Sequence, residues 1–407
     1  MLKLDSSLTK ENRNYLTVPV LKDFCKRNSI KIVAGSNRAD IIKLIEKFAN
    51  NSDENERQTL DFLEQSFKEG AKTLKIKKIR KEIEINDVIL NRKVKTHFPE
   101  YEASYIITTI PQNNLDLVRY SVELDGDHLN RISFSFLVQL LTGKYPKEDS
   151  GEVIVYPIFV DVDFETGFII GRGKPVSVLF EYNENSLKFS ENVKTSYMRL
   201  IDQAIETVQM LTNYSEEEKG KVEKGFKQAV FRLLESFSFT PKEIEKKVSK
   251  FNPKIEGILN CFENVYNLKL DKNLRKSAKY DLGIFVEKFL SITYPDEEIF
   301  IKDRDAFPYR ISVMDHEYVK VDETAGLRQP IQRKEAFFDN KKAVFFHKKC
   351  DKVHLCFRRL NEKYFGNKPY RVIVEAKQDV CLIDFPEYVR EEDIQNVLSR
   401  ILEFYTL

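Results

Sequence analysis

The pattern of apolar and polar positions along the chain is clearest near its beginning. Between residues 15 and 48, apolar residues recur at helical spacing in two short stretches, which a basic connector separates. Repeats at this spacing place apolar side chains on one face of a helix. The pattern therefore predicts a helix, an extended loop at 29–35 and a second helix, which Ser36 or Asn37 can cap.

The spacing of apolar residues also divides the rest of the chain into segments that are expected to be helical or β-rich. Residues 51–72 are expected to form a linker and a bridging helix. Alternating apolar and polar residues predict a β-rich segment at 73–189, and helical spacing predicts a helical segment at 190–292. Strands return in an α+β segment at 293–407. The expected fold class is α+β: a small N-terminal helical module, residues 1–50, followed by a larger mixed body whose β-rich segments flank a helical block.

Several finer features follow from turn-forming and helix-breaking residues. A hairpin turn is expected at 165–167, inside the strongest β region. Pro253 is expected to punctuate the helical block ahead of a helix at 255–266. A strand is expected at 343–347. The polar run at 50–56 predicts that the N-terminal module is self-contained and makes few contacts with the body.

Charge is distributed unevenly, although the chain as a whole is close to neutral. The formal net charge is +2, whereas residues 1–50 contain ten Lys or Arg and five Asp or Glu, a balance of +5. The remaining residues therefore carry −3. This asymmetry indicates a locally basic module on a neutral body.

The basic residues of the module fall mostly off its apolar stripes, where they face solvent. The start of the second helix offers free backbone N–H groups and the positive end of the helix dipole, and Arg38 adds a guanidinium. These features favour phosphate binding. The candidate DNA-binding residues are Lys22, Lys26, Arg27, Lys31, Ser36, Asn37 and Arg38. The alternative is a helical hairpin whose lysines are merely solvated.

The module resembles the SAP and HeH/LEM class of helix–extended loop–helix domains. The matching residues are Leu-Thr-Val-Pro-x-Leu-Lys at 16–22, Ile-x-Ile at 30–32, Gly35, and Arg-Ala-Asp-Ile-Ile-x-Leu-Ile at 38–45. The resemblance covers about 35 residues and implies DNA binding through the loop and the start of the second helix. Members of the class also bind proteins, so a role as a protein–protein assembly adaptor stays open.

A second basic run lies at the start of the β-rich segment. It consists of Lys75, Lys77, Lys78, Arg80 and Lys81, interleaved with apolar residues. Such a strand can follow a phosphate backbone. The alternative, which the spacing favours, is an edge strand whose solvent face is protected by lysines.

One short motif raises the alternative of a metal-dependent nuclease. Residues 372–377 place Glu375 and Lys377 as in the E-x-K strand of the PD-(D/E)xK nuclease fold, where acidic residues hold a divalent cation and the lysine positions water. Asp296 can supply the upstream acid. The interval between Asp296 and Glu375 is much longer than is typical of that fold, so an ordinary strand is favoured.

Other side chains form candidate ion sites by spacing alone. Four zinc-ligand types occur within ten residues, at His347, Cys350, His354 and Cys356, and a hairpin turning at Cys350 would bring the two histidines together. Their spacing fits no zinc module, and half-buried histidines and cysteines are the favoured interpretation.

Two aspartate pairs and one glycine-rich segment complete the list of motifs. The pairs are Asp161 with Asp163, and Asp125 with Asp127 ahead of His128; turn or strand aspartates are commoner than cation sites. The segment 171–174, Gly-Arg-Gly-Lys, lacks the spacing of a P-loop and precedes a proline, so nucleotide hydrolysis is rejected.

Composition limits the class of protein further. The five cysteines, an odd number, and the lack of a secretory signal predict free thiols in a reducing compartment. No run of 18 apolar residues occurs, so the expectation is a cytoplasmic protein with no membrane partner and no cofactor. Abundant Lys, Ile and Asn with no Trp are typical of AT-rich genomes and favour a prokaryotic or phage source. The function predicted is that of a non-catalytic DNA-binding protein whose body binds a protein partner or acts as a sensor.

Overall fold

The computed structural model describes residues 2–4, 15–80, 85–111, 115–125, 128–183, 186–314, 320–326, 328–361 and 368–405. The chain folds into two compact units. Unit 1 comprises residues 1–222, 359–370 and 378–398, and unit 2 comprises residues 223–358, 371–377 and 399–407. Both contain helices and antiparallel strands, so the predicted α+β class is confirmed.

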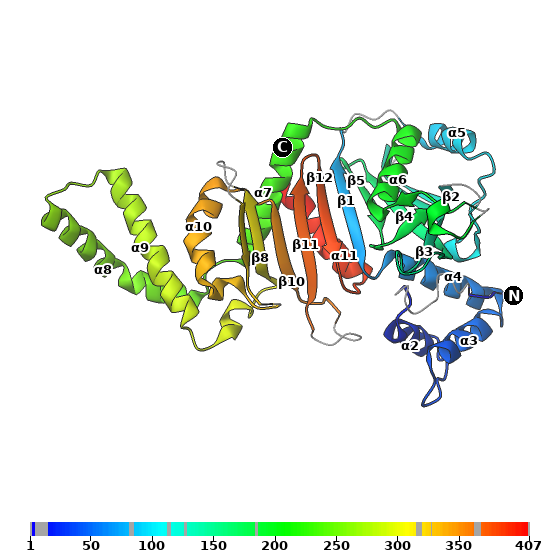
Figure 1. The fold of residues 1–407 in the computed structure, drawn as a ribbon, viewed down its shortest axis with the longest axis horizontal. Coiled ribbons are helices and arrows are strands. Elements are labelled where there is room, and N and C mark those ends of the chain that lie inside the picture. The colour runs from blue at the N-terminus through cyan, green and yellow to red at the C-terminus, as the bar shows by residue number, and fades with distance from the viewer. Residues whose placement is uncertain are drawn as a thin grey trace. The chain divides into compact units, whose positions relative to one another are not determined.

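Unit 1 is built on an antiparallel sheet (Figure 1). Its strands are β1 (Lys72–Lys78), β2 (Asp116–Asp125), β3 (His128–Thr142), β4 (Glu152–Asp163), β5 (Phe168–Gly173), β6 (Leu179–Glu181), β7 (Lys194–Thr195) and β12 (Val380–Phe385). They run in the order β7-β6-β3-β4-β5-β1-β12, and β2 also pairs with β3. The predicted turn at 165–167 joins β4 to β5, with Gly167 at a φ of 71°.

The helices of unit 1 come mainly from the first half of the chain. They are α2 (Val18–Arg27), α3 (Arg38–Ala49), α4 (Asp53–Lys68), α5 (Asp87–His97) and α6 (Tyr197–Thr212), with short 3-10 turns η2 (Ile106–Thr108) and η3 (Phe189–Glu191). Helix α5 lies inside the segment that was predicted to be β-rich.

Unit 2 combines a smaller group of strands with long helices. Its strands are β8 (Ala306–Met314), β9 (Lys320–Thr324), β10 (Lys352–Phe357) and β11 (Tyr370–Lys377), in the order β11-β10-β8-β9. Its helices are α7 (Lys219–Phe237), α8 (Lys242–Tyr266), α9 (Lys272–Ile292) and α10 (Glu335–His347), with 3-10 turns η4 (Glu297–Phe300) and η5 (Ile331–Arg333). The last helix, α11 (Glu391–Phe404), has residues in both units.

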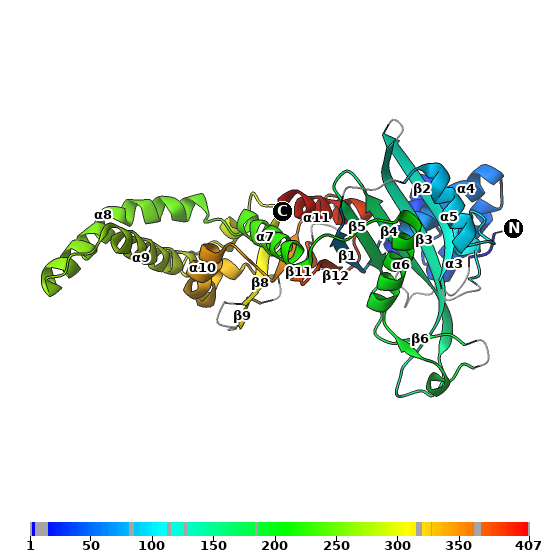
Figure 2. The same cartoon turned by 90° about the horizontal axis from the view of Figure 1, so that it is seen from above.

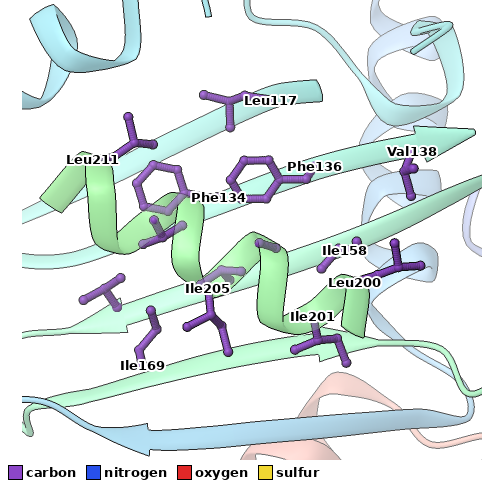
Figure 3. Packing of buried hydrophobic residues seen from close by; sticks show 14 of the residues in the cluster. Leu117, Phe134, Phe136, Val138, Ile158, Ile169, Leu200, Ile201, Ile205 and Leu211 are labelled. Carbon is purple, nitrogen blue, oxygen red and sulfur yellow. The ribbon is translucent and has the colours of Figure 1, made fainter. Parts of the chain in front are cut away.

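Alternation along β3 and β4 gives unit 1 two separate apolar cores. One face of the sheet carries Phe134, Phe136 and Ile158, which pack against α6 through residues such as Ile201 and Ile205 (Figure 3). The neighbouring positions point to the opposite face, because successive side chains of a strand alternate. The sheet is therefore buried on both sides.

The opposite face is covered by α4 and by the N-terminal helix pair. Leu137 and Phe159 from the sheet share one core with Leu63 of α4, and with Phe24 and Ile41 of the helix pair. Figure 1 shows α2 and α3 beside α4. The predicted helix–loop–helix is present, but the prediction that it is self-contained is wrong. Two short helices bury too little apolar surface alone, and α4 and the sheet complete their core.

Helix α6 approaches the sheet closely at the Gly-Arg-Gly-Lys segment. A Cβ at Gly171 would lie 2.5 Å from Cγ2 of Ile201, and one at Gly173 would lie 2.8 Å from the hydroxyl of Tyr156. The two glycines are thus required for helix-on-sheet packing. Their role is structural, in agreement with the rejection of a nucleotide loop.

Two secondary-structure predictions for unit 2 are wrong. Residues 343–347 belong to α10 and form no strand; a short apolar run does not distinguish a strand from a buried helix. Pro253 lies inside α8, which continues through it. The carbonyl left without a helical donor belongs to Ser249, and both Ser249 and Pro253 are exposed, so water can hydrogen-bond to this carbonyl.

The glycine packing gives a stability prediction with an internal control. We expect Gly171→Ala to lower the free energy of unfolding by about 1–3 kcal/mol, because the added methyl overlaps Ile201 and Ile205. Gly257→Ala, in the exposed interior of α8 with nothing near its Cβ, is expected to raise it by up to about 1 kcal/mol. Urea denaturation followed by circular dichroism measures both; equal effects at the two sites would contradict the packing argument.

Candidate nucleic-acid interface

The predicted DNA-binding residues divide into two groups. Lys22, Lys26 and Lys31 are exposed, and no hydrogen bond or ion pair joins them to the described residues. Lys22 and Lys26 lie one turn apart on α2, and Lys31 lies in the loop that follows. These three ammonium groups are available for an external anion.

The other members of the set hold the module together. Arg38 donates a 2.6 Å hydrogen bond to the carbonyl oxygen of Leu16, which ties the start of α3 to the segment before α2. Arg27 pairs with Asp23, one turn earlier on α2, and Arg390 approaches the same carboxylate at 3.4 Å. Ser36 donates its backbone N–H to the carbonyl of Val33 at the tip of the loop.

The start of α3 is less open to an anion than the sequence predicts. Asn37 and Asp40 form a capping box in which each side chain accepts a 3.0 Å hydrogen bond from the other's backbone N–H. Two of the N–H groups are therefore occupied, and the carboxylate of Asp40 stands where an incoming phosphate would be. The exposed lysines, and not the helix terminus, are the stronger part of the candidate interface.

The loop between the two helices turns through two residues of positive φ. Ser29 has a φ of 56° and Gly35 a φ of 87°. Between them, the side chain of Val33 is 73% exposed at the tip. The loop thus presents Lys31 and backbone groups outward on a base fixed by Arg38.

Three lysines of the second basic run have partners within unit 1. Strand β1 pairs with β12 on one side and β5 on the other, so the prediction of an edge strand is wrong. Lys75 pairs with Asp202 and Lys77 with Glu216 at 2.7 Å, while Lys78 donates to the carbonyl of Thr166 at 2.7 Å. Arg80 is exposed beyond the strand, and Lys81 lies outside the described residues.

In the nuclease motif, the carboxylate of Glu375 forms ion pairs with two lysines. Glu375 accepts Lys352 at 2.9 Å and Lys377 at 3.2 Å. Burial acts to raise the pKa of Glu375, but the two lysines together hold it below its ordinary value. Asp296 instead caps η4 by accepting the backbone N–H of Glu298 at 2.9 Å. Glu375 is thus committed to an internal ion-pair cluster.

The proposed zinc ligands are not arranged as a hairpin. His347 ends helix α10, and its side chain lies outside the described part of the structure. Cys350 is buried, and its thiol donates to the carbonyl of Lys352 at 3.4 Å. His354 and Cys356 are buried in β10. Among the described residues, no group of three or more His, Cys, Asp or Glu side chains could hold a metal ion.

The aspartate pairs also have structural partners where the structure describes them. Asp161 accepts the hydroxyl of Ser133 at 2.5 Å, and Asp163 accepts the backbone N–H of Thr166 at 2.8 Å in the β4–β5 turn. Asp127 and the side chains of Asp125 and His128 lie outside the described residues.

Sequence patterns did not identify a cluster of buried charges beneath the helix pair. Arg172 is 2% exposed and forms a bidentate pair with Glu391 at the start of α11. The ammonium groups of Lys72 and Lys174 lie 4.9 Å and 4.3 Å from the centre of the ring of Tyr15. Sequence patterns could not reveal that Lys72 and Lys174 lie close together, because they are about a hundred residues apart and only the pairing of β1 with β5 brings them together.

The charge of Lys72 is buried at an electrostatic cost. It is 1% exposed, and its ammonium has no hydrogen-bond acceptor among the described residues. Burial, and then the nearby charges of Lys174 and Arg172, lower the pKa of Lys72 well below its ordinary value. The carboxylates of Glu391 and Glu69 oppose that shift. The cluster therefore has an electrostatic cost that the surrounding core has to offset.

Two cavities border this cluster in unit 1. One, of about 440 Å³, is lined on its charged side by Lys68, Arg131, Arg172, Glu123, Asp161 and Glu391. The other, of about 420 Å³, lies between Arg27, Glu69 and Arg390. Both mix charges of the two signs, so neither favours an anionic ligand such as a phosphate.

Comparison with known proteins gives no family assignment. A scan against protein-family models found no match, and a search of curated proteins also found none. Within the described residues, no helix combines the length and the apolar character that a membrane span needs. The geometry of the chain's own residues is accordingly the basis for a functional proposal.

The buried lysine gives a prediction about stability and pH. The unfolded chain binds a proton at Lys72 over a pH range in which the folded chain does not, so this group makes stability rise with pH up to its ordinary pKa of 10.5. We expect Lys72→Met to raise the free energy of unfolding at pH 7 by about 1 kcal/mol or more.

The same reasoning sets the pH dependence of that difference. The advantage of Lys72→Met should shrink as the pH approaches about 10, because the unfolded wild-type lysine then also loses its proton. Urea titrations of both proteins across this range provide the measurement. A variant that is less stable at every pH would mean that Glu391 and Glu69 more than compensate for the burial of the charge.

Proposed function

We propose that this chain is a non-catalytic DNA-binding protein that contacts the phosphate backbone through its N-terminal helix–loop–helix. The observation that carries the proposal is the set of three exposed and uncommitted lysines, Lys22, Lys26 and Lys31, on α2 and its loop. The resemblance of residues 15–48 to SAP and HeH/LEM domains supports the same assignment. In those domains the loop and the adjacent helix start meet the DNA.

The packing of the module supports this use of the lysines. The helix pair shares its core with α4 and the sheet, so the lysines project from a fixed base and not from a flexible tail. At the end of the loop, Asn37 caps α3 and Arg38 bonds to the carbonyl oxygen of Leu16. A fixed charge array loses less conformational entropy on binding than a flexible one does.

The expected binding is electrostatic and largely independent of DNA sequence. Phosphate contacts position a protein on DNA but carry no base information. With three phosphates engaged, the logarithm of affinity should fall with the logarithm of salt concentration at a slope of about −2.7, at about −0.9 per contact.

The two alternative functions differ in how well the structure supports them. The nuclease would use Glu375 and Lys377 with Asp296, but Glu375 is held by two lysines and Asp296 caps a helix. The adaptor is supported by an exposed apolar surface on α8 and α9, which belongs to unit 2. An adaptor surface there is compatible with DNA binding by the module.

The DNA proposal predicts the outcome of a charge-removal experiment. We expect the triple variant Lys22→Gln, Lys26→Gln and Lys31→Gln to weaken duplex binding at least tenfold and to flatten the salt slope by about 2 to 3 units, because each lysine lost removes about one released counterion. Fluorescence anisotropy with labelled duplex at several salt concentrations measures both quantities. Sequence preference should not change.

A matched control lies on α8. Lys246, Lys250 and Lys254 are likewise exposed, and their replacement by Gln removes the same charge from the same chain. The control triple should retain wild-type affinity. If it loses affinity while the module triple does not, DNA binds elsewhere and the proposal is wrong. Deletion of the module is unsuitable, because it would expose the apolar face of α4.

A further inference from the structure

Helices α8 and α9 form a long hairpin within unit 2. The two helices contact each other along their lengths and run side by side in both views (Figures 1 and 2). The hairpin extends away from the strands of unit 2, and α10 packs only against part of α9. Much of its surface therefore faces solvent.

That surface is unusually apolar. Among the described residues, nineteen large apolar side chains are exposed, and nine of them belong to this 51-residue hairpin. They are Ile258, Phe262, Val265, Tyr266, Leu268, Leu274, Tyr280, Phe285 and Phe289. Scattered exposed apolar residues are normal, whereas a concentration of this kind marks an interaction surface.

The exposed residues form a stripe on each helix. On α8, Ile258, Phe262 and Val265 follow i, i+4, i+7 spacing, which places them on one face. On α9, Phe285 and Phe289 lie about three and about four turns after Leu274. Within each stripe neighbouring rings touch: the ring centres of Phe262 and Tyr266, and those of Phe285 and Phe289, are each 4.9 Å apart.

The hairpin alone does not bury these stripes. In the half of α8 that follows Pro253, Ile255 and Leu259 are buried, and both lie along the inner edge of the stripe. Arg275 bonds Glu263 at 2.6 Å and Glu256 at 3.0 Å, and Lys279 bonds Glu256 at 2.6 Å. Because these ion pairs close one side of the α8–α9 contact, the apolar edges of both helices remain exposed on the other side.

The exposed area matches what a stable protein–protein contact needs. The two stripes together contain seven residues that are each about half exposed: Ile258, Phe262, Val265, Tyr266, Leu274, Phe285 and Phe289. A large apolar or aromatic side chain offers roughly 150–250 Å², so each hairpin leaves on the order of 700 Å² of apolar surface uncovered. A standard interface buries about 800 Å² on each partner. One additional helical hairpin of the same length would cover the stripes.

We propose that the α8–α9 hairpin is the dimerisation surface of this protein and that its occupant is the same hairpin of a second copy. The two hairpins pack stripe to stripe across a two-fold axis and form a four-helix bundle. An isologous contact of this kind needs one self-complementary patch, and the aromatic and aliphatic residues of the two stripes provide it. A dimer also carries two copies of the N-terminal module, but its formation does not depend on DNA.

Charge gives the dimer a distinctive signature. Residues 242–292 contain eleven Lys or Arg and seven Asp or Glu, so each hairpin carries +4 and two hairpins repel each other. Salt screens that repulsion while leaving apolar contact intact, so dimerisation should strengthen as salt rises. Binding of an acidic partner or of nucleic acid to the same surface would weaken under the same change.

The test is sedimentation equilibrium of the full-length protein without DNA, at micromolar concentrations and at low and high salt. We expect wild-type protein, with a monomer mass of 47.8 kDa, to sediment as a dimer whose dissociation constant falls with salt. Phe262→Glu and Phe285→Glu should each raise that constant at least about 100-fold, because each substitution enters the two-fold interface twice.

Two glycines provide matched controls on the same helices. Gly257 lies five residues before Phe262 and Gly283 lies two residues before Phe285, which places both on the far side of their helices at about 100° per residue. Nothing lies within 4 Å of a Cβ at either position. Gly257→Glu and Gly283→Glu add the same charge and should leave the dimer intact.

The exposed thiol of Cys261 on α8 gives a second readout. Cys25, Cys350, Cys356 and Cys381 are buried, so a nitroxide reagent should label Cys261 selectively. Electron–electron distance measurements should show a defined separation between copies in wild-type protein and none in Phe285→Glu. Monomeric wild-type protein at high salt, or a dimer equally weakened by Gly283→Glu, would overturn the proposal. Intact circular dichroism in every variant confirms that folding is not what changed.

Discussion

The sheet of unit 1 has to be covered on both faces, and this constraint explains most of the unit's architecture. Strands β3 and β4 carry large apolar residues on one face and further apolar residues, such as Leu137 and Phe159, on the other, so both faces have apolar surface to cover. Helix α6 covers one side, where Gly171 and Gly173 let it approach. The other side is covered by α4 and the N-terminal helix pair. The helix pair is thus an integral part of the fold of unit 1.

The same packing places a set of charges in the interior. Arg172 belongs to a strand that is buried on both faces, and Glu391 at the start of α11 neutralises it. Lys72 and Lys174 lie on the ring of Tyr15, immediately before the helix pair. A buried charge tolerates little displacement, because its partners have to remain in place. The cluster therefore fixes the segment from which the module begins and supports the rigid presentation of its lysines.

The α8–α9 hairpin of unit 2 differs from the helices of unit 1, because part of its apolar surface is not covered by the described residues. In unit 1 the apolar faces of helices and strands pack against one another, whereas the apolar stripes of α8 and α9 are exposed to solvent along one side. Both helices are well formed, with a capped start at Asp271 and an interhelical ion-pair cluster, so the exposure does not come from poor folding. A surface that folds well and remains apolar is best understood as an interface. The proposed DNA contact and the proposed self-association therefore involve different elements of the chain.

The sequence by itself determined the elements whose signals are local. Apolar spacing located the two helices of the N-terminal module, α2 and α3, and turn-forming residues located the turn at 165–167 that joins β4 to β5. The charge balance of residues 1–50 indicated a locally basic module, and the resemblance to SAP and HeH/LEM domains implied DNA binding, which stays a prediction. Two local signals led to wrong predictions. The apolar run at 343–347 belongs to a helix, because such a run occurs in strands and in buried helices. Helix α8 continues through Pro253, because the carbonyl of Ser249, which loses its helical donor, lies at an exposed position where water can bond to it.

Tertiary structure alone decided which of the candidate residues are available to a ligand. In the sequence, the lysines at 75, 77 and 78 look as available as those at 22, 26 and 31. In the structure, however, their strand pairs with β5 and β12. Their ammonium groups bond to carboxylates and to a carbonyl from distant parts of the chain. Likewise, Glu375 forms an ion pair with Lys352, a partner that the sequence did not predict. The sequence shows which charged side chains a chain carries, but the tertiary fold decides which of them form ion pairs with one another. A contact between residues a hundred positions apart produces no repeating pattern in the sequence, so pattern analysis cannot detect it.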